Sequence, residues 1–328
     1  MKKIYVDRPM KYFLLLSLNC SLFSFIHCSD DNSDQTKTDK PYDKTATKDK
    51  GSDKTNTEFT NMNADTIIYD GLIREYILYV PEAYDSLSPV PLMLNFHGNG
   101  GSARGHLSDT DMTAVADIEN FILVYPQGSL LDGTSHWNPG LETPENKSNT
   151  DDFRFIEVLI QEITSSYVID STRIYACGYS NGAMFAYGLA CYSSDKIAAI
   201  GSVSGSMLEE TLNNCTPLHP MAMINIHGTS DFVLPYEGLS GAYSSIEDIL
   251  DYWTSFNHTT TDPLTNSITD NGTLIEYYAY QDGDSGTSVE HYKIVEGDHV
   301  WFDLSYEGAN TSQLIWDFVS KYDLNGLK

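Results

Sequence analysis

Hydrophobic and polar residues follow two different periods along most of this chain. Residues 73–80 alternate between apolar and polar, as in a half-buried strand, whereas residues 91–96 and 121–125 are continuous apolar runs typical of central parallel strands. Between residues 152 and 167 apolar side chains recur at helical spacing, which predicts a helix with one face toward the core. Continued alternation of this kind predicts an α/β fold: a mainly parallel central sheet flanked by helices, in a single domain over residues 61–328.

The N-terminal part has a different composition. Residues 1–27 begin with basic side chains and continue into an apolar run, which predicts an export signal. Cys28 follows it, a layout that resembles bacterial lipoproteins, in which a lipidated cysteine is the first mature residue; Cys20 is a competing position. Residues 28–60 are mostly Asp, Lys, Thr, Ser and Asn, which predicts a disordered polar tether. We therefore expect an extracellular or cell-surface protein that reaches the membrane only through a lipid anchor.

The net charge of the chain limits the classes of molecule that it can bind. With 19 basic and 46 acidic residues, its formal net charge is −27. A molecule of this charge repels polyanions, so we expect no nucleic-acid partner.

One motif indicates chemistry. Residues 178–182, Gly-Tyr-Ser-Asn-Gly, match the pattern G-x-S-x-G, directly after an apolar strand at 173–176 and before a helical pattern at 183–190. In this context the glycines permit a tight turn that exposes a strained serine, the nucleophile elbow of serine hydrolases. The alternative is a harmless turn, but the strand and helix on either side favour Ser180 as a nucleophile.

A serine nucleophile needs a histidine and an acid on later loops. Residues 221–226 predict a buried strand with Asp231 in the loop that follows it, and residues 291–297 predict a last strand with His299 after it. Asp298 competes as the acid, but a direct neighbour rarely reaches its partner's ring. His97 and His227 lie in glycine turns, where we expect structural hydrogen bonds.

The same chemistry needs backbone donors for an oxyanion. Asn181, the residue after the serine, supplies one N–H group. The loop at 97–101, His-Gly-Asn-Gly-Gly, resembles the HGGG-type loop of esterases, and we expect Asn99 to supply the second.

With Ser180, Asp231 and His299 identified, residues 73–316 resemble the exported esterase group that contains feruloyl esterases, acetyl xylan esterases and polyhydroxybutyrate depolymerases. The matching pieces lie at 97–98, 125–128, 137–138, 151–152, 178–184, 227–231, 235–236 and 299–301. The resemblance implies an α/β-hydrolase fold and an acyl-enzyme mechanism without metal or cofactor. It also implies a disulfide between Cys191 and Cys215, although both, with Cys177, can equally be read as small buried hydrophobes.

The sequence indicates the substrate ester less directly than it indicates the reacting groups. Trp137, Tyr179 and Trp301 are expected to line an aromatic acyl pocket suited to a feruloyl group, and core packing of these rings is equally compatible with the sequence. We expect a carbohydrate-linked ester, with loops at 129–149 and 234–245 shaping the choice. Acetyl xylan and polyhydroxybutyrate are alternative substrates; a serine peptidase or a catalytically silent glycan-binding protein are alternatives of another class. Residues 282–286 suggest a hairpin turn rather than a calcium loop.

Overall fold

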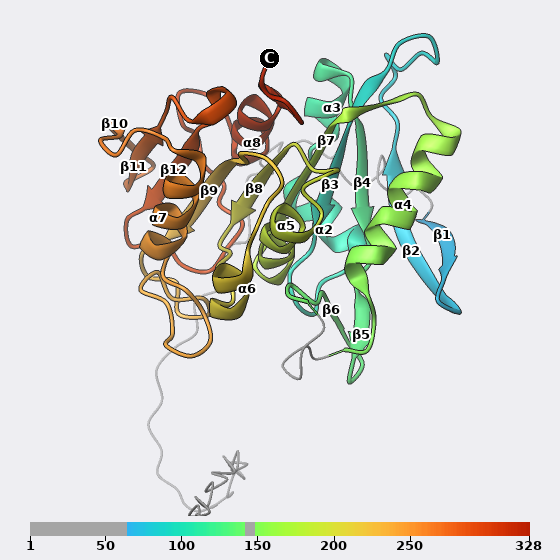
Figure 1. The fold of residues 1–328 in the computed structure, drawn as a ribbon, viewed down its shortest axis with the longest axis horizontal. Helices are drawn as coiled ribbons and strands as arrows, with labels where there is room; N and C mark the ends of the chain where they lie inside the picture. The colour runs from blue at the N-terminus through green and yellow to red at the C-terminus, as the bar shows by residue number, and fades with distance from the viewer. Residues whose placement is uncertain (1–63, 142–147) are drawn as a thin grey trace, which may run out of the picture. The chain divides into compact units, whose positions relative to one another are not determined.

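A ten-stranded sheet runs through the computed structural model, which describes residues 64–141 and 148–328. The strand order is β1-β2-β4-β3-β7-β8-β9-β12-β11-β10 (Figure 1). The bounds of these strands are β1 Ala64–Tyr69, β2 Leu72–Tyr79, β3 Val90–Phe96, β4 Ile122–Pro126, β7 Ile169–Tyr179, β8 Ala199–Val203, β9 Ala222–Gly228, β10 Leu264–Asp270, β11 Thr273–Tyr280 and β12 Val289–Ile294. The expected export signal, Cys28 and the expected tether lie outside the described residues.

The central strands β4, β3, β7, β8, β9 and β12 run parallel, and antiparallel pairs extend both edges. Strands β3 and β4 are buried along their whole length, as their unbroken apolar runs predict. The hairpin β10–β11 was not predicted, because β10 is largely exposed and too polar to show a clear period. The turn expected at residues 282–286 connects β11 to β12.

Helices cover both faces of the sheet. One hydrophobic cluster joins the sheet to α4 (Asp152–Ser166), α5 (Asn181–Tyr192) and α7 (Ile246–Asn257); the other joins it to α2 (Ala103–Thr110), α3 (Thr113–Glu119) and α8 (Thr311–Val319). This arrangement confirms the predicted α/β architecture and the helix expected at residues 152–167. The smaller elements are β5 (Ser129–Leu131), β6 (Thr134–His136), α6 (Glu209–Asn214), β13 (Tyr322–Asp323) and β14 (Gly326–Leu327).

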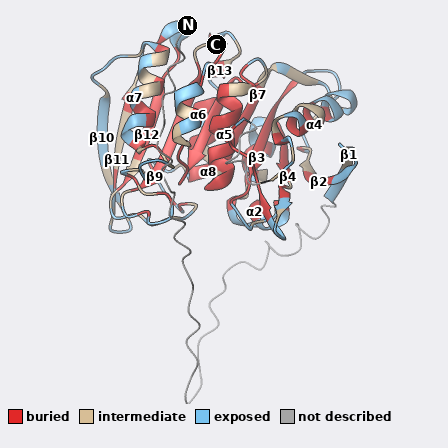
Figure 2. Cartoon of the chain, turned by 60° about the horizontal axis from the view of Figure 1, so that its bottom comes forward, coloured by how far each residue is buried: buried red, intermediate tan, exposed pale blue. Residues whose placement is uncertain are grey.

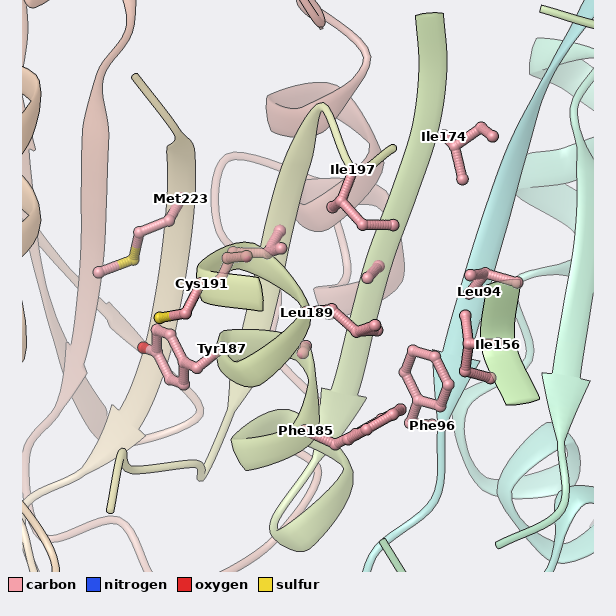
Figure 3. Close-up of a cluster of buried hydrophobic side chains, with 14 of the residues drawn as sticks. Leu94, Phe96, Ile156, Ile174, Phe185, Tyr187, Leu189, Cys191, Ile197 and Met223 are labelled. Carbon is pink, nitrogen blue, oxygen red and sulfur yellow. The ribbon is translucent and has the colours of Figure 1, made fainter. Parts of the chain in front are cut away.

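Helix α5 is buried at every position except its last residue, Tyr192, and Figure 2 shows it almost entirely in the colour of buried residues. Its Phe185 packs edge-on against Phe96 of β3, with ring centroids 5.1 Å apart (Figure 3). Phe185 also stacks on Trp137 at 5.1 Å. Because close-packed interiors resist displacement, this packing fixes the start of α5 relative to the sheet.

A disulfide joins Cys191, near the end of α5, to Cys215, directly after α6, with the Cα atoms 4.8 Å apart. Cys177 is buried on β7 as a free thiol. In the described part of the chain, no helix is long and apolar enough to cross a bilayer.

Candidate active site

Ser180 lies on the sharp turn between β7 and α5. Its backbone dihedrals are φ 54° and ψ −123°, a conformation that a side chain rarely adopts. The flanking glycines are required by contact: a Cβ on Gly178 would lie 2.5 Å from the carbonyl carbon of Gly182, and one on Gly182 would lie 2.2 Å from the carbonyl oxygen of Phe96. The two glycines of the G-x-S-x-G pattern thus stand where this turn has no room for a side chain.

Ser180, His299 and Asp231 form one hydrogen-bonded chain. His299 Nε2 lies 2.8 Å from Ser180 Oγ, and His299 Nδ1 lies 2.7 Å from Asp231 Oδ2. With its Nδ1–H donated to the carboxylate, the neutral ring accepts the serine hydroxyl at Nε2. The structure places Asp231 against this ring, whereas Asp298 is exposed.

The carboxylate of Asp231 has several neighbouring N–H groups. Its Oδ1 accepts the backbone N–H groups of Val233 and Leu234, and its Oδ2 also lies 3.3 Å from Nε2 of the fully buried His227. Burial alone would raise the pKa of Asp231, but the hydrogen bonds from His227, His299 and Leu234 outweigh it and hold the pKa well below its usual range. The acid therefore stays ionised next to His299.

The histidine loop is held from several sides. Tyr179 donates its hydroxyl to the carbonyl of His299 at 2.8 Å, and Ser204 donates its hydroxyl to the carbonyl of Val300 at 2.8 Å. Burial, assisted by the charge of Asp231, raises the pKa of Tyr179, so its hydroxyl remains a donor. These contacts hold the backbone of residues 299 and 300 in place.

The loop that carries Asn99 is built on His97. The Nε2 atom of His97 accepts the backbone N–H of Gly128 at 2.9 Å, and its Nδ1 lies 2.7 Å from the carbonyl oxygen of Gly98. Burial lowers the pKa of His97, which suits a neutral ring that accepts at Nε2. His227 Nε2 lies 2.9 Å from the carbonyl oxygen of Leu234, so both histidines make structural hydrogen bonds, as their positions predict.

A cavity of about 1030 Å³ opens beside Ser180. Asn99 and Asn181 both line it, and the backbone N–H of Asn181 opens α5, where an N–H group has no acceptor within the helix. The cavity walls come from three segments: residues 131–139, residues 208–214 and residues 233–243. The first and last were expected to shape the substrate site; the middle one, α6, was not.

Trp137 does not line this cavity. Its side chain has no exposed surface, and its indole N–H donates to the carbonyl of His97 at 3.1 Å. The expectation that Trp137 contacts substrate is therefore wrong: its ring fills the core beside Phe185, and its backbone is bridged by the side-chain amide of Asn181.

Tyr179 and Trp301 are half-buried and are not among the residues that line the cavity. Tyr179 packs against His299 with ring centroids 5.2 Å apart, and Trp301 packs edge-on against the buried His106 at 5.7 Å. Tyr179 thus contacts His299 directly, whereas the ring of Trp301 packs against α2 through His106.

One buried ion pair near the site was not predicted. Arg74 Nη2 lies 3.0 Å from Asp152 Oδ1, and Asp152 Oδ2 accepts the backbone N–H of Asn138, which lines the cavity. Burial raises the pKa of Asp152 and lowers that of Arg74, against the attraction of each for the other. An arginine in an alternating strand gave no sequence signal, because its partner is 78 residues away.

Comparisons with known proteins agree with this geometry. Residues 87–262, more than half of the chain, match the model of the family described as Phospholipase/Carboxylesterase. A bifunctional acetylxylan esterase/xylanase from Neocallimastix patriciarum is 30% identical over 257 residues, which cover 78% of this chain and 34% of that protein. Feruloyl esterase B from Piromyces equi is 27% identical over 217 residues, covering 62% of this chain and 39% of that protein.

The chain thus spans between 34% and 39% of the length of these two relatives. Among solved structures, the feruloyl esterase module from Clostridium thermocellum superposes with a TM-score of 0.54 at 13% identity, covering 79% of this chain and 86% of that one. This likeness confirms the expected α/β-hydrolase fold. The family match, and the esterase names of the relatives, confirm the resemblance inferred from the motifs: the chain belongs to the phospholipase/carboxylesterase family.

Proposed function

We propose that this protein is an exported serine esterase that removes feruloyl or acetyl groups from plant polysaccharide. The observation that carries the proposal is the chain from Ser180 through His299 to Asp231 at the edge of a large cavity. The names of the similar proteins, feruloyl and acetylxylan esterases, support the choice of ester.

The reaction follows from the positions of these groups. The Oγ atom of Ser180 attacks the ester carbonyl carbon while its proton passes to Nε2 of His299. The backbone N–H groups of Asn181 and Asn99 stabilise the oxyanion. The alcohol leaves with the proton from His299, and a water molecule, deprotonated by the same nitrogen, then releases the acid and restores Ser180.

Asp231 acts throughout as an anion. Its depressed pKa keeps it ionised, so it orients the ring of His299 and stabilises the imidazolium that forms during each attack. No step of this mechanism uses a metal. Among residues 64–141 and 148–328, no three His, Cys, Asp or Glu side chains are grouped as metal ligands.

The test is hydrolysis of a matched set of substrates by the purified protein and by Ser180→Ala. The set contains methyl ferulate, acetylated xylan, a hydroxybutyrate oligomer, p-nitrophenyl acetate and a prolyl peptide. Cleavage of ferulate or acetyl esters that disappears in the variant is expected. Cleavage of the peptide alone, or equal inertness of both proteins on every ester, would reject the esterase.

Export and lipidation at Cys28 complete the proposal. Expression in a bacterial host with labelled palmitate tests them: label and membrane association are expected for the natural chain, and both are lost in Cys28→Ser. Label that persists in Cys28→Ser and disappears in Cys20→Ser would assign the anchor to the competing position.

A further inference from the structure

A second cavity of about 810 Å³ adjoins the one beside Ser180. Glu209, Asn213 and Tyr243 line both, so the two cavities share a wall. The second is otherwise lined by Leu212 of α6, by residues of the segment 237–245 and by residues of helix α7. The second cavity therefore lies directly next to the one that contains Ser180.

Two aromatic side chains of α7, Tyr252 and Phe256, line the second cavity. The rings of Tyr252 and Phe256 are nearly parallel, with centroids 6.0 Å apart and an interplanar angle of 13°. Both residues are half-buried and line the cavity. Flat apolar faces of this kind suit the C–H faces of pyranose rings, which also carry hydroxyl groups for polar neighbours.

Most of the other side chains that line the second cavity are acidic or carry a hydroxyl group, and Leu212 and Leu239 add apolar surface. Glu237, Asp248 and Asp251 are exposed at its edge, as are Ser240 and Ser255, whereas Ser245 is half-buried and Ser244 is buried. The described residues that line the two cavities include no lysine or arginine. Carboxylates accept hydrogen bonds from sugar hydroxyls, but they repel a ligand that is itself anionic.

The wall between the cavities is fixed before any ligand binds. The carboxylate of Glu209 accepts the backbone N–H of Gly241 at 2.9 Å, and Tyr252 donates its hydroxyl to the carbonyl of Cys215 at 2.9 Å. Cys215 is in turn bonded to Cys191 of α5. A preformed wall limits the loss of entropy when a flexible chain binds.

We propose that the second cavity is a subsite for uncharged sugar residues of the polysaccharide chain that carries the ester. This inference rests on the proposed esterase activity for the position of the ester, and on the second cavity itself for the ligand. It predicts that the protein prefers esters on neutral oligosaccharides over the same ester on one sugar or on an oligomer of uronic acids.

The first experiment compares kcat/KM for a feruloylated neutral trisaccharide with that for the feruloylated monosaccharide. The natural protein is expected to prefer the trisaccharide by about tenfold, which corresponds to one or two ring contacts. Phe256→Ala should bring this ratio close to one and leave p-nitrophenyl acetate hydrolysis unchanged. Tyr69→Ala is the matched control, because it removes a half-buried ring on the far edge strand β1 and should preserve the ratio.

The second experiment measures binding without catalysis. Calorimetry with Ser180→Ala should detect xylotriose but not trigalacturonate, and Phe256→Ala in that background should abolish the signal. Adding Asp251→Lys should improve binding of trigalacturonate, whereas Asp65→Lys on β1, an equal change of charge, should not.

The outcomes separate the two proposals. If esters are cleaved but the trisaccharide has no advantage and xylotriose does not bind, the subsite is rejected and the esterase stands. If no ester is cleaved but xylotriose binds in a manner that depends on Phe256, the subsite stands and the esterase is rejected. Equal binding of xylotriose and trigalacturonate would reject the selectivity for neutral sugars.

Discussion

Gly228 and Gly297 hold the acid loop against the histidine loop at van der Waals contact. A Cβ on Gly228 would lie 2.2 Å from the carbonyl oxygen of Gly297, and Ser230 donates its backbone N–H to that same oxygen at 2.9 Å. The distance between Asp231 and His299 therefore depends on a contact that only backbone atoms make.

Gly228→Ala should separate these two loops. We expect the free energy of unfolding to fall by about 1–3 kcal/mol or more, as for other overpacked sites, and kcat to fall with it. Thermal unfolding and kinetics on p-nitrophenyl acetate measure both. Gly105→Ala in α2 is the control, since the added Cβ would meet only Ser102 Oγ at 3.2 Å; a loss of similar size there would show that the contact at Gly228 is not special.

Asp231→Asn should leave the fold intact and lower kcat by about 10⁴-fold, because the amide cannot hold the required tautomer of His299 or stabilise its cation. Asp298→Asn, on the exposed neighbour, should change kcat less than twofold. If the two variants were equally active, the acid of the triad would be assigned wrongly.

The free energy of unfolding should depend on pH in part through the ionisation of Asp231. Its pKa is depressed in the folded state, so the ionised form stabilises the fold above the unfolded pKa of about 3.9. This contribution is lost as the pH falls through the folded-state pKa. Urea unfolding between pH 6 and 3 should show a smaller loss of stability for Asp231→Asn than for the natural chain. An identical slope would contradict the depressed pKa.

Removing one charge of the pair Arg74 and Asp152 should destabilise the fold more than replacing both charges. Asp152→Asn leaves the guanidinium buried without its counter-ion, and we expect a loss of about 3–5 kcal/mol. The double variant Arg74→Met with Asp152→Asn should recover much of that loss. A double-mutant cycle by urea denaturation measures the coupling; strictly additive losses would mean that the two charges do not interact.

The disulfide between Cys191 and Cys215 should stabilise the fold and fix the cavity wall. Replacing both cysteines by serine is expected to lower the free energy of unfolding by about 2–4 kcal/mol.

Burial raises the pKa of the Cys177 thiol, so this third cysteine should resist alkylation until the protein is unfolded. Rapid labelling of native Cys177 would show that β7 opens more readily than its burial indicates.

Most of the fold was predictable from local patterns. Unbroken apolar runs identified β3 and β4, and the helical spacing identified α4, because their burial leaves a strong period in the sequence. The hairpin β10–β11 was not predictable, since exposed edge strands tolerate polar residues on both faces.

The residues that the structure brings together as a hydrogen-bonded chain were also predictable, because the topology orders them along the sequence. Ser180, Asp231 and His299 each follow a recognisable strand. The cavity lining was not predictable: Trp137 has the side chain expected of a binding site, but side-chain type does not reveal whether a ring faces the core or the solvent. The contacts of His227 and Arg74 depend on distances that only the folded chain defines.

The reacting groups and the cavity walls occupy different stretches of chain. The former lie at strand ends, while the walls come from residues 131–139, 208–214 and 233–243, and the disulfide ties only one of these stretches to the core. Insertions or substitutions in the walls can thus accumulate without a change at the elbow, where glycine is obligatory. Each wall of the cavity can therefore be exchanged separately by protein engineering, without a change to the turn that carries Ser180.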